Sequence, residues 1–122
     1  MNDKRHPKAE KHIVSLELIK IKMMIKEGKY CFYGDREKNI ESLARAGILA
    51  SDVKDFILGL RVEDYLNGPV DDRNTGEKDC VWEFGVKVSD DMKDFYIKVM
   101  VSDEVICYSF HEQEKPFVYH YR

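Results

Sequence analysis

The sequence predicts an α+β fold in which N-terminal helices pack on one face of a small antiparallel sheet. Apolar residues recur mainly at helical spacing over residues 12–60 and alternate with polar ones over residues 80–111. Helices followed by an antiparallel meander are typical of an α+β domain. The 122 residues are enough for one hydrophobic core. We expect a polar tail at residues 1–10, a single domain over 11–116 and a second tail at 117–122.

The first helix is predicted over residues 12–27 and ends at Gly28, a suitable C-cap. One face of this helix carries Val14, Leu18, Ile21 and Ile25. The opposite face carries Leu16, Ile19 and Met23. A helix that is apolar on two sides is buried on both sides or keeps one for a partner. The alternation within residues 16–23 also fits a strand.

A short strand and a second helix are expected next. Residues 30–33 form an aromatic strand candidate, which Gly34 and Asp35 close with a turn. Residues 36–47 predict a helix, and its apolar side is expected to comprise Ile40, Leu43 and Ala44.

A third helix and a loop complete the first half of the chain. Ser51 is the expected N-cap of a helix over residues 52–60. Residues 61–65 predict a brief extended piece. The Gly, Pro, Asn and Asp content of residues 66–79 predicts a loop.

Three alternating runs, residues 80–88, 95–101 and 105–111, predict antiparallel strands. The expected core face comprises Trp82, Phe84, Val86, Phe95, Ile97, Val99, Val101, Ile106, Tyr108 and Phe110. The opposite face is expected to carry Glu83, Gly85, Lys87, Tyr96, Lys98, Val105, Cys107, Ser109 and His111.

The register of the last two strands decides which polar side chains meet. A two-residue turn at residues 103–104 places Tyr96 opposite His111 and Lys98 opposite Ser109. A turn one residue earlier slides the pairing by two residues and keeps the same set on one face. A three-residue turn would move His111 to the other face, so the apolar pattern predicts an even-numbered loop.

The polar face combines groups that can cut an RNA backbone. Glu83 and Lys87 join it from the preceding strand, and Gly85, Cys107 and Ser109 leave it concave. In such a cleavage a base takes the proton of a ribose 2′-hydroxyl, a cation stabilises the phosphorane, and an acid protonates the leaving 5′-oxygen. Polar residues also occur on any solvated face of an antiparallel sheet, so this set alone does not identify an activity.

Composition limits the classes of site and compartment. The net charge is −3, whereas nucleic-acid binders usually carry a basic excess, so an RNA site must be a local patch. The three cysteines form no C-x-x-C pair and the four histidines no i, i+4 pair, so we expect no disulfide framework, metal or cofactor. With neither a signal peptide nor a run of about 20 apolar residues, a cytoplasmic protein without membrane contact is expected.

Several segments together resemble the MqsR family of bacterial toxins. They are GLRVEDYLNGPVDD, VWEFGVKV, FYIKVMV and VICYSFHEQEKP, with YGDREKNIESLARAGI upstream, and the resemblance spans residues 12–116. It implies a RelE-like fold and an mRNA-cleaving toxin of a type II toxin–antitoxin pair. It also implies metal-free cleavage of single-stranded mRNA and an antitoxin as protein partner.

The matched positions suggest catalytic roles. Tyr96 stands at the family tyrosine of the Y-I-K strand, with Lys98 two residues on. His111 and Glu83 stand where the best-known member has lysine and glutamine, and Asn67 falls near another family lysine. The resemblance therefore implies that the roles are redistributed.

We expect His111 to act as general acid or base, since a free imidazole titrates at about pH 6.5. Lys98 is the expected phosphate clamp, and Tyr96 stacks a base or moves a proton. Glu83 orients His111 or acts as the base. The expected substrate contacts are Lys87, Arg36, Asn67 and Ser109.

Two other functions stay open. The chain could be a non-catalytic α+β module that binds a partner through the exposed apolar side of its first helix. It could also be a structural protein, with a homodimer as the simplest assembly. Growth arrest on expression, relieved by His111→Ala and Tyr96→Ala, separates the toxin from both.

Overall fold

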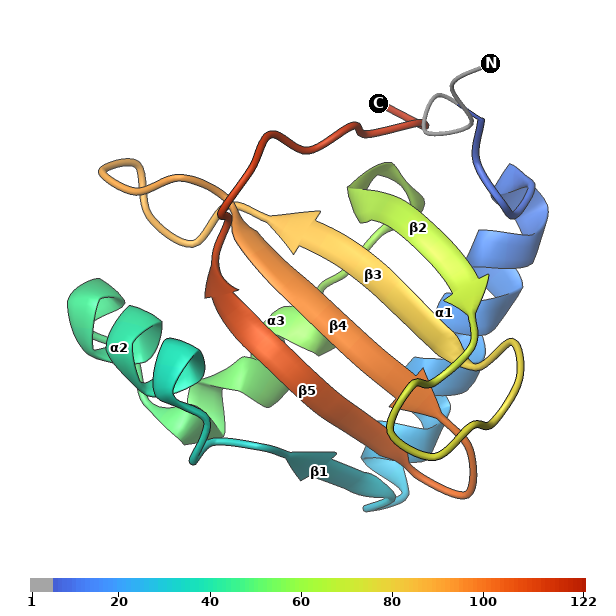
Figure 1. Ribbon diagram of the computed structural model, residues 1–122, viewed down its shortest axis with the longest axis horizontal. Coiled ribbons are helices and arrows are strands. Elements are labelled where there is room, and N and C mark those ends of the chain that lie inside the picture. The colour runs from blue at the N-terminus through green and yellow to red at the C-terminus, as the bar shows by residue number, and fades with distance from the viewer. Residues whose placement is uncertain (1–5) are drawn as a thin grey trace.

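The computed structural model describes residues 6–122 and has an α+β architecture (Figure 1). Its helices are α1 (Lys11–Lys26), α2 (Glu37–Ala46) and α3 (Val53–Leu58), with 3-10 turns at Ala50–Asp52 and Val62–Asp64. Its strands are β1 (Tyr30–Phe32), β2 (Tyr65–Val70), β3 (Val81–Val86), β4 (Phe95–Val101) and β5 (Val105–Glu112). Within residues 6–122, no helix is both long enough and apolar enough to cross a membrane.

The sheet is mixed, which corrects the antiparallel sheet expected from the sequence. Its strand order is β1-β5-β4-β3-β2, and β1 runs parallel to β5, with Tyr30 opposite Val105 and Phe32 opposite Cys107. The meander β2 to β5 is antiparallel. Because β4 already pairs with one edge of β5, β1 takes the other edge. The alternation of side chains carries no information about that direction.

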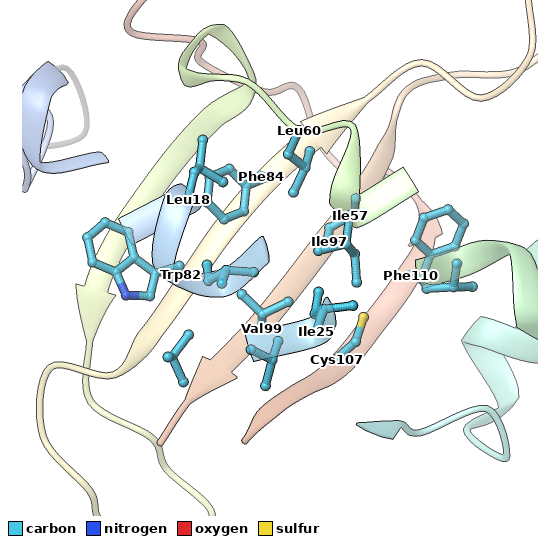
Figure 2. Packing of buried hydrophobic residues seen from close by; sticks show 14 of the residues in the cluster. Leu18, Ile25, Ile57, Leu60, Trp82, Phe84, Ile97, Val99, Cys107 and Phe110 are labelled. Carbon is cyan, nitrogen blue, oxygen red and sulfur yellow. The ribbon is translucent and has the colours of Figure 1, made fainter. Parts of the chain in front are cut away.

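The core lies between the sheet and the helices behind it. Of the two apolar faces of α1, one is buried: Val14, Leu18, Ile21 and Ile25 are each at most 4% exposed. Figure 2 shows Leu18, Ile25, Ile57 and Leu60 close to Trp82, Phe84, Ile97 and Val99 of the sheet. Burial of each such large side chain contributes roughly 1.5–3 kcal/mol. Because the helices cover this face of the sheet, the opposite face is the one that they leave uncovered.

The opposite side of α1 remains uncovered in the monomer. Leu16 is 61% exposed, and Ile19 and Met23 are each 56% exposed. A helix with two apolar faces can bury both or only one, and α1 buries only one.

The β4–β5 connection differs from the expected even-numbered turn. The loop has three residues between the paired Val101 and Val105. A β-bulge then follows, in which Tyr108 has no partner between the pairs Lys98–Ser109 and Val99–Cys107. The extra residue shifts the register by one and undoes the effect of the odd loop. The predicted pairs Tyr96–His111 and Lys98–Ser109 are confirmed.

The bulge also exchanges the faces of the residues before it. Val105 and Cys107 are fully buried in the core against the helices, although both were expected on the polar face. Tyr108 and Ile106 pack on the other side with Cys80, Val81 and Met100, although both were expected in the core. Phe110 lies on its predicted side, in the main core.

Strand β2 was missed because its residues were predicted to be a loop. It is an edge strand with two irregularities in its register against β3. Pro69 is tolerated at such an edge, where a missing N–H breaks no ladder bond. Gly68 has φ of +121°, and a Cβ there would lie 2.7 Å from the Val81 carbonyl oxygen. Gly68 and Pro69, which are typical of turns, are therefore accommodated here in an irregular edge strand.

Other local predictions also need correction. Ser51 lies within the 3-10 turn Ala50–Asp52 instead of capping a helix, and Asp52 Oδ2 accepts a hydrogen bond from the Leu49 N–H at 2.9 Å. Ile40 is 51% exposed, so the buried side of α2 is formed by Asn39, Ser42 and Leu43. The extended piece expected at residues 61–65 contains a 3-10 turn.

The C-terminal segment, residues 114–122, crosses one end of the sheet toward the start of α1 (Figure 1). Tyr121 stacks on Tyr65 with ring centroids 5.7 Å apart and donates a hydrogen bond to the Ala9 carbonyl oxygen at 2.6 Å. Arg122 forms an ion pair with Asp64 at 3.4 Å. Residues predicted as two tails therefore meet; residues 1–5 lie outside the described part.

Candidate active site

A cavity of about 740 Å³ opens on the face of the sheet away from α1 and α3. Its floor is formed by Glu83 of β3, Tyr96 of β4, and Ser109 and His111 of β5. The rim comes from segments that are distant in the sequence. It comprises His6, Lys8, Lys38, Leu66, Asn67, Arg73, Glu114, Lys115, Pro116, Phe117, Val118 and His120.

The sheet register brings most of the predicted site residues together. Glu83 lies opposite Asn67 on β2 and opposite Lys98 on β4. Tyr96 lies opposite His111 on β5. All of these except Lys98 line the cavity. The alternation of polar and apolar residues indicated Glu83, Tyr96 and His111, whereas Asn67 came from the family resemblance.

Three predicted cations lie outside the cavity. Lys98 is on the same face, but its ammonium lies 5.8 Å from the centre of the Tyr108 ring. The Arg36 guanidinium also faces Tyr108, at 5.2 Å from the ring centre. Lys87 follows the end of β3 and is exposed. None of the three is placed to clamp a phosphate held between Tyr96 and His111.

The ring of His111 is buried and has a defined orientation. Its Nδ1 lies 3.0 Å from the carbonyl oxygen of Glu112. A carbonyl oxygen only accepts hydrogen bonds, so this contact requires a proton on Nδ1. In the neutral ring the lone pair is then on Nε2, the nitrogen that does not face this carbonyl. This tautomer suits a general base.

The phenol of Tyr96 is held in its protonated form. Burial raises the pKa of Tyr96 well above its ordinary value, and the neighbouring Glu83 carboxylate raises it further. Its ring lies beside that of His111, with centroids 5.5 Å apart. At neutral pH Tyr96 can therefore donate a proton or a hydrogen bond, whereas it is unsuited to act as a phenolate base.

The rim supplies positive charge that the sequence did not identify. Lys8, Arg73 and Lys115 are exposed, line the cavity and form no ion pair within residues 6–122. Lys38 is bound to Glu114 at 2.9 Å, so its charge is compensated. Residues 8, 73 and 115 are far apart in the sequence, and only the fold brings them to the same cavity. The cavity is thus a local basic patch on a chain of net charge −3.

Helix α2 fixes the strand that carries His111. Beyond Cys107, β5 has no strand on its outer edge, and α2 binds its backbone instead. Asn39 is 1% exposed; its Nδ2 donates to the Tyr108 carbonyl oxygen at 3.1 Å and its Oδ1 accepts from the Phe110 N–H at 2.9 Å. Ser42 Oγ accepts from the Glu112 N–H at 3.0 Å. No sequence signal distinguishes Asn39 from a solvated helix residue.

Within residues 6–122, no group of three or more His, Cys, Asp and Glu side chains is arranged to hold a metal ion. Comparison with protein-family models, curated proteins and solved structures gives no match. The chemistry available to the cavity follows from the side chains that line it.

Proposed function

We propose that this protein is an endoribonuclease that cleaves single-stranded RNA in the cavity described above. One observation carries the proposal. The imidazole of His111, the phenol of Tyr96 and the carboxylate of Glu83 line a single cavity. The same cavity has unpaired cations on its rim, although the chain as a whole is acidic. An anionic, flexible polymer with a reactive hydroxyl matches both features.

The cleavage proceeds by attack within the RNA chain. Nε2 of His111 takes the proton of a ribose 2′-hydroxyl, and the oxygen forms a bond to the adjacent phosphorus. The bond from phosphorus to the 5′-oxygen breaks, and that oxygen takes the proton of Tyr96. The products are a 2′,3′-cyclic phosphate and a 5′-hydroxyl. Transfer of the His111 proton back to Tyr96, directly or through water, restores the starting state.

Glu83 and the rim cations support this step. The negative charge of Glu83 keeps the proton on Tyr96 in the resting state. In the proposed mechanism it also favours the imidazolium that forms at His111. Arg73 or Lys115 takes the role expected of Lys98 and neutralises charge on the phosphorane. In this complex the phosphate of the RNA takes the place of solvent beside Arg73 and Lys115.

The biological role that fits this activity is a toxin of a type II toxin–antitoxin pair. It would act on mRNA in the bacterial cytoplasm, without a cofactor, and would be held inactive by an antitoxin. The support is the sequence resemblance to MqsR toxins over residues 12–116. A RelE-like arrangement, with helices on one face of the sheet and reacting groups on the other, is part of this proposal.

The exposed face of α1 favours a second candidate, a protein-binding module. Leu16, Ile19 and Met23 form an apolar stripe, flanked by the exposed Lys20 and Lys26. An apolar stripe between lysines fits an acidic amphipathic segment of another protein. In a toxin–antitoxin pair that segment would belong to the antitoxin.

The deciding experiment uses purified protein, 5′-labelled single-stranded RNA of defined sequence, and EDTA. We expect cleavage with 2′,3′-cyclic phosphate ends. His111→Ala and Tyr96→Ala should abolish cleavage, whereas Lys87→Ala, outside the cavity, should cleave like the wild type. Cleavage that persists at the wild-type rate in both alanine variants would show that neither side chain carries the reaction and would overturn the proposed site. Absence of cleavage by the wild type, together with binding of an acidic partner at α1, would favour the second candidate.

A further inference from the structure

The aromatic rings on the cavity wall form a row that continues beyond the proposed catalytic pair. The ring centroids of His111 and Tyr96 are 5.5 Å apart, and those of Tyr96 and Phe117 are 6.3 Å apart. All three residues line the cavity. Phe117 belongs to the C-terminal segment, so the row combines two strands with the end of the chain.

Phe117 is held in place by contacts with Tyr119 and Gly85. Tyr119 packs edge-on against it, with centroids 5.9 Å apart, and donates a hydrogen bond to Asp94 Oδ2 at 2.5 Å. Gly85 lies against both side chains: a Cβ there would come within 2.5 Å of the Tyr119 hydroxyl oxygen and 2.8 Å of Phe117 Cδ2. Only glycine leaves room for this approach. Because Gly85 pairs with Tyr96, the same contact keeps Phe117 next to Tyr96.

This arrangement is not explained by core packing. Phe117 belongs to neither of the two clusters of buried hydrophobic residues and is half-buried. Lys115, two residues earlier, is exposed at the cavity rim. A pre-positioned aromatic face beside a cation is the combination with which proteins bind single-stranded nucleic acid: the ring stacks on a base and the cation holds a phosphate.

We infer that Phe117, set beside Tyr96 by Gly85 and Tyr119, forms a nucleobase-stacking subsite next to the cleaved linkage. The inference rests on the proposed function and adds a specificity element to it. The base that stacks on Phe117 belongs to a nucleotide flanking the scissile phosphate. The C-terminal segment is therefore part of the substrate site.

The test measures binding of a 2′-deoxy oligonucleotide, which lacks the attacking hydroxyl. A matched set lacks one base at each position in turn. Phe117→Leu keeps apolar bulk and removes the π face. It should weaken binding of the intact oligonucleotide by about 5- to 150-fold, the range of a lost base–aromatic stack. Phe117→Tyr should bind like the wild type, and Leu49→Ala, on a distant exposed residue, serves as control.

The stacking role predicts a position-specific result. For one abasic oligonucleotide the affinities of wild type and Phe117→Leu should be equal, because the stacked base is already absent. Gly85→Ala, which displaces the ring, should give the same pattern. Two results would overturn the subsite while wild-type cleavage still supported the proposed function. In the first, Phe117→Leu binds every abasic oligonucleotide more weakly than the wild type does, by the same factor. In the second, Phe117→Leu binds the intact oligonucleotide as tightly as the wild type. A wild type that neither cleaves RNA nor binds any oligonucleotide would overturn both.

Discussion

The rings of Tyr96 and His111 lie side by side across β4 and β5, with centroids 5.5 Å apart. This relationship depends on two irregularities that cancel. The odd-numbered turn after Val101 alone would place His111 among the helices, and the bulge at Tyr108 returns it to the open face. The predictions below test what this pair does and what holds it in place.

Tyr96→Phe should slow cleavage by roughly 10²- to 10⁴-fold, the usual contribution of a positioned proton donor. The ring and its packing remain, so the melting temperature should stay near that of the wild type. Single-turnover cleavage of labelled RNA measures the rate. Tyr33→Phe removes a phenol outside the cavity and should leave the rate unchanged. A Tyr96→Phe rate equal to wild type would remove the phenol from the mechanism.

Glu83→Gln should lower the pKa of Tyr96 toward its ordinary value of 10.0, because the carboxylate charge that helps to raise it is gone. Tyr96 then loses its proton at lower pH than in the wild type. An ultraviolet titration of phenolate absorbance checks this shift, with Glu83→Gln/Tyr96→Phe as the reference that identifies the signal of Tyr96. Identical titrations of the wild type and Glu83→Gln would show that the carboxylate does not act on the phenol.

Arg73→Ala should weaken RNA binding and reduce its salt dependence. Each phosphate contact on a single strand contributes about 0.7 to the slope of log affinity against log salt concentration. The slope should therefore fall by about that amount in Arg73→Ala, and not in Lys87→Ala. Binding isotherms at several salt concentrations measure both variants. An unchanged slope in Arg73→Ala would place the phosphates elsewhere.

Asn39→Ala should destabilise the fold by about 1–3 kcal/mol. The buried Phe110 N–H and the Tyr108 carbonyl would lose the side-chain partners that Asn39 provides. Cleavage should also fall, since β5 carries His111. Ile40→Ala, at an exposed position of the same helix, should change stability by no more than about 0.5 kcal/mol. Urea unfolding of both variants gives the comparison.

Stability should decrease in acid partly through Asp72, which is 2% exposed. Burial alone would raise the pKa of Asp72, but hydrogen bonds from Asn74, Tyr108 and Thr75 outweigh it and lower the pKa below its ordinary 3.8. A carboxyl with a lowered folded-state pKa stabilises the protein above that ordinary value and loses this contribution as the pH falls.

Asp72→Asn should therefore be less stable than the wild type at neutral pH, and the difference should shrink below about pH 4. Thermal unfolding across pH measures this. Because Asp72 Oδ2 accepts from the Tyr108 hydroxyl at 2.9 Å, it also anchors the loop that carries Arg73. A constant difference at all pH values would exclude the titration of this carboxyl as the cause.

The sequence by itself determined the helices and the strands β1, β3, β4 and β5. It also predicted the shared face of Tyr96 and His111, although the chain reaches that face through an odd-numbered turn and the bulge at Tyr108. A side-chain period of two places alternate residues on opposite sides of a strand, and this local rule needs no knowledge of the rest of the fold. The helical period of about 100° per residue likewise separated the two apolar faces of α1, and the structure decided that Leu16, Ile19 and Met23 lie on the exposed one. These features depend on neighbours within a few residues.

Only the tertiary structure decided the direction of β1, the bulge at Tyr108 and the composition of the cavity rim. Arg73, Lys115 and Phe117 reach the cavity because a loop and the chain end fold over the sheet. Asn39 is buried because β5 needs a partner for its outer edge. Such contacts join residues that are far apart in the sequence, and no local pattern of polarity records them.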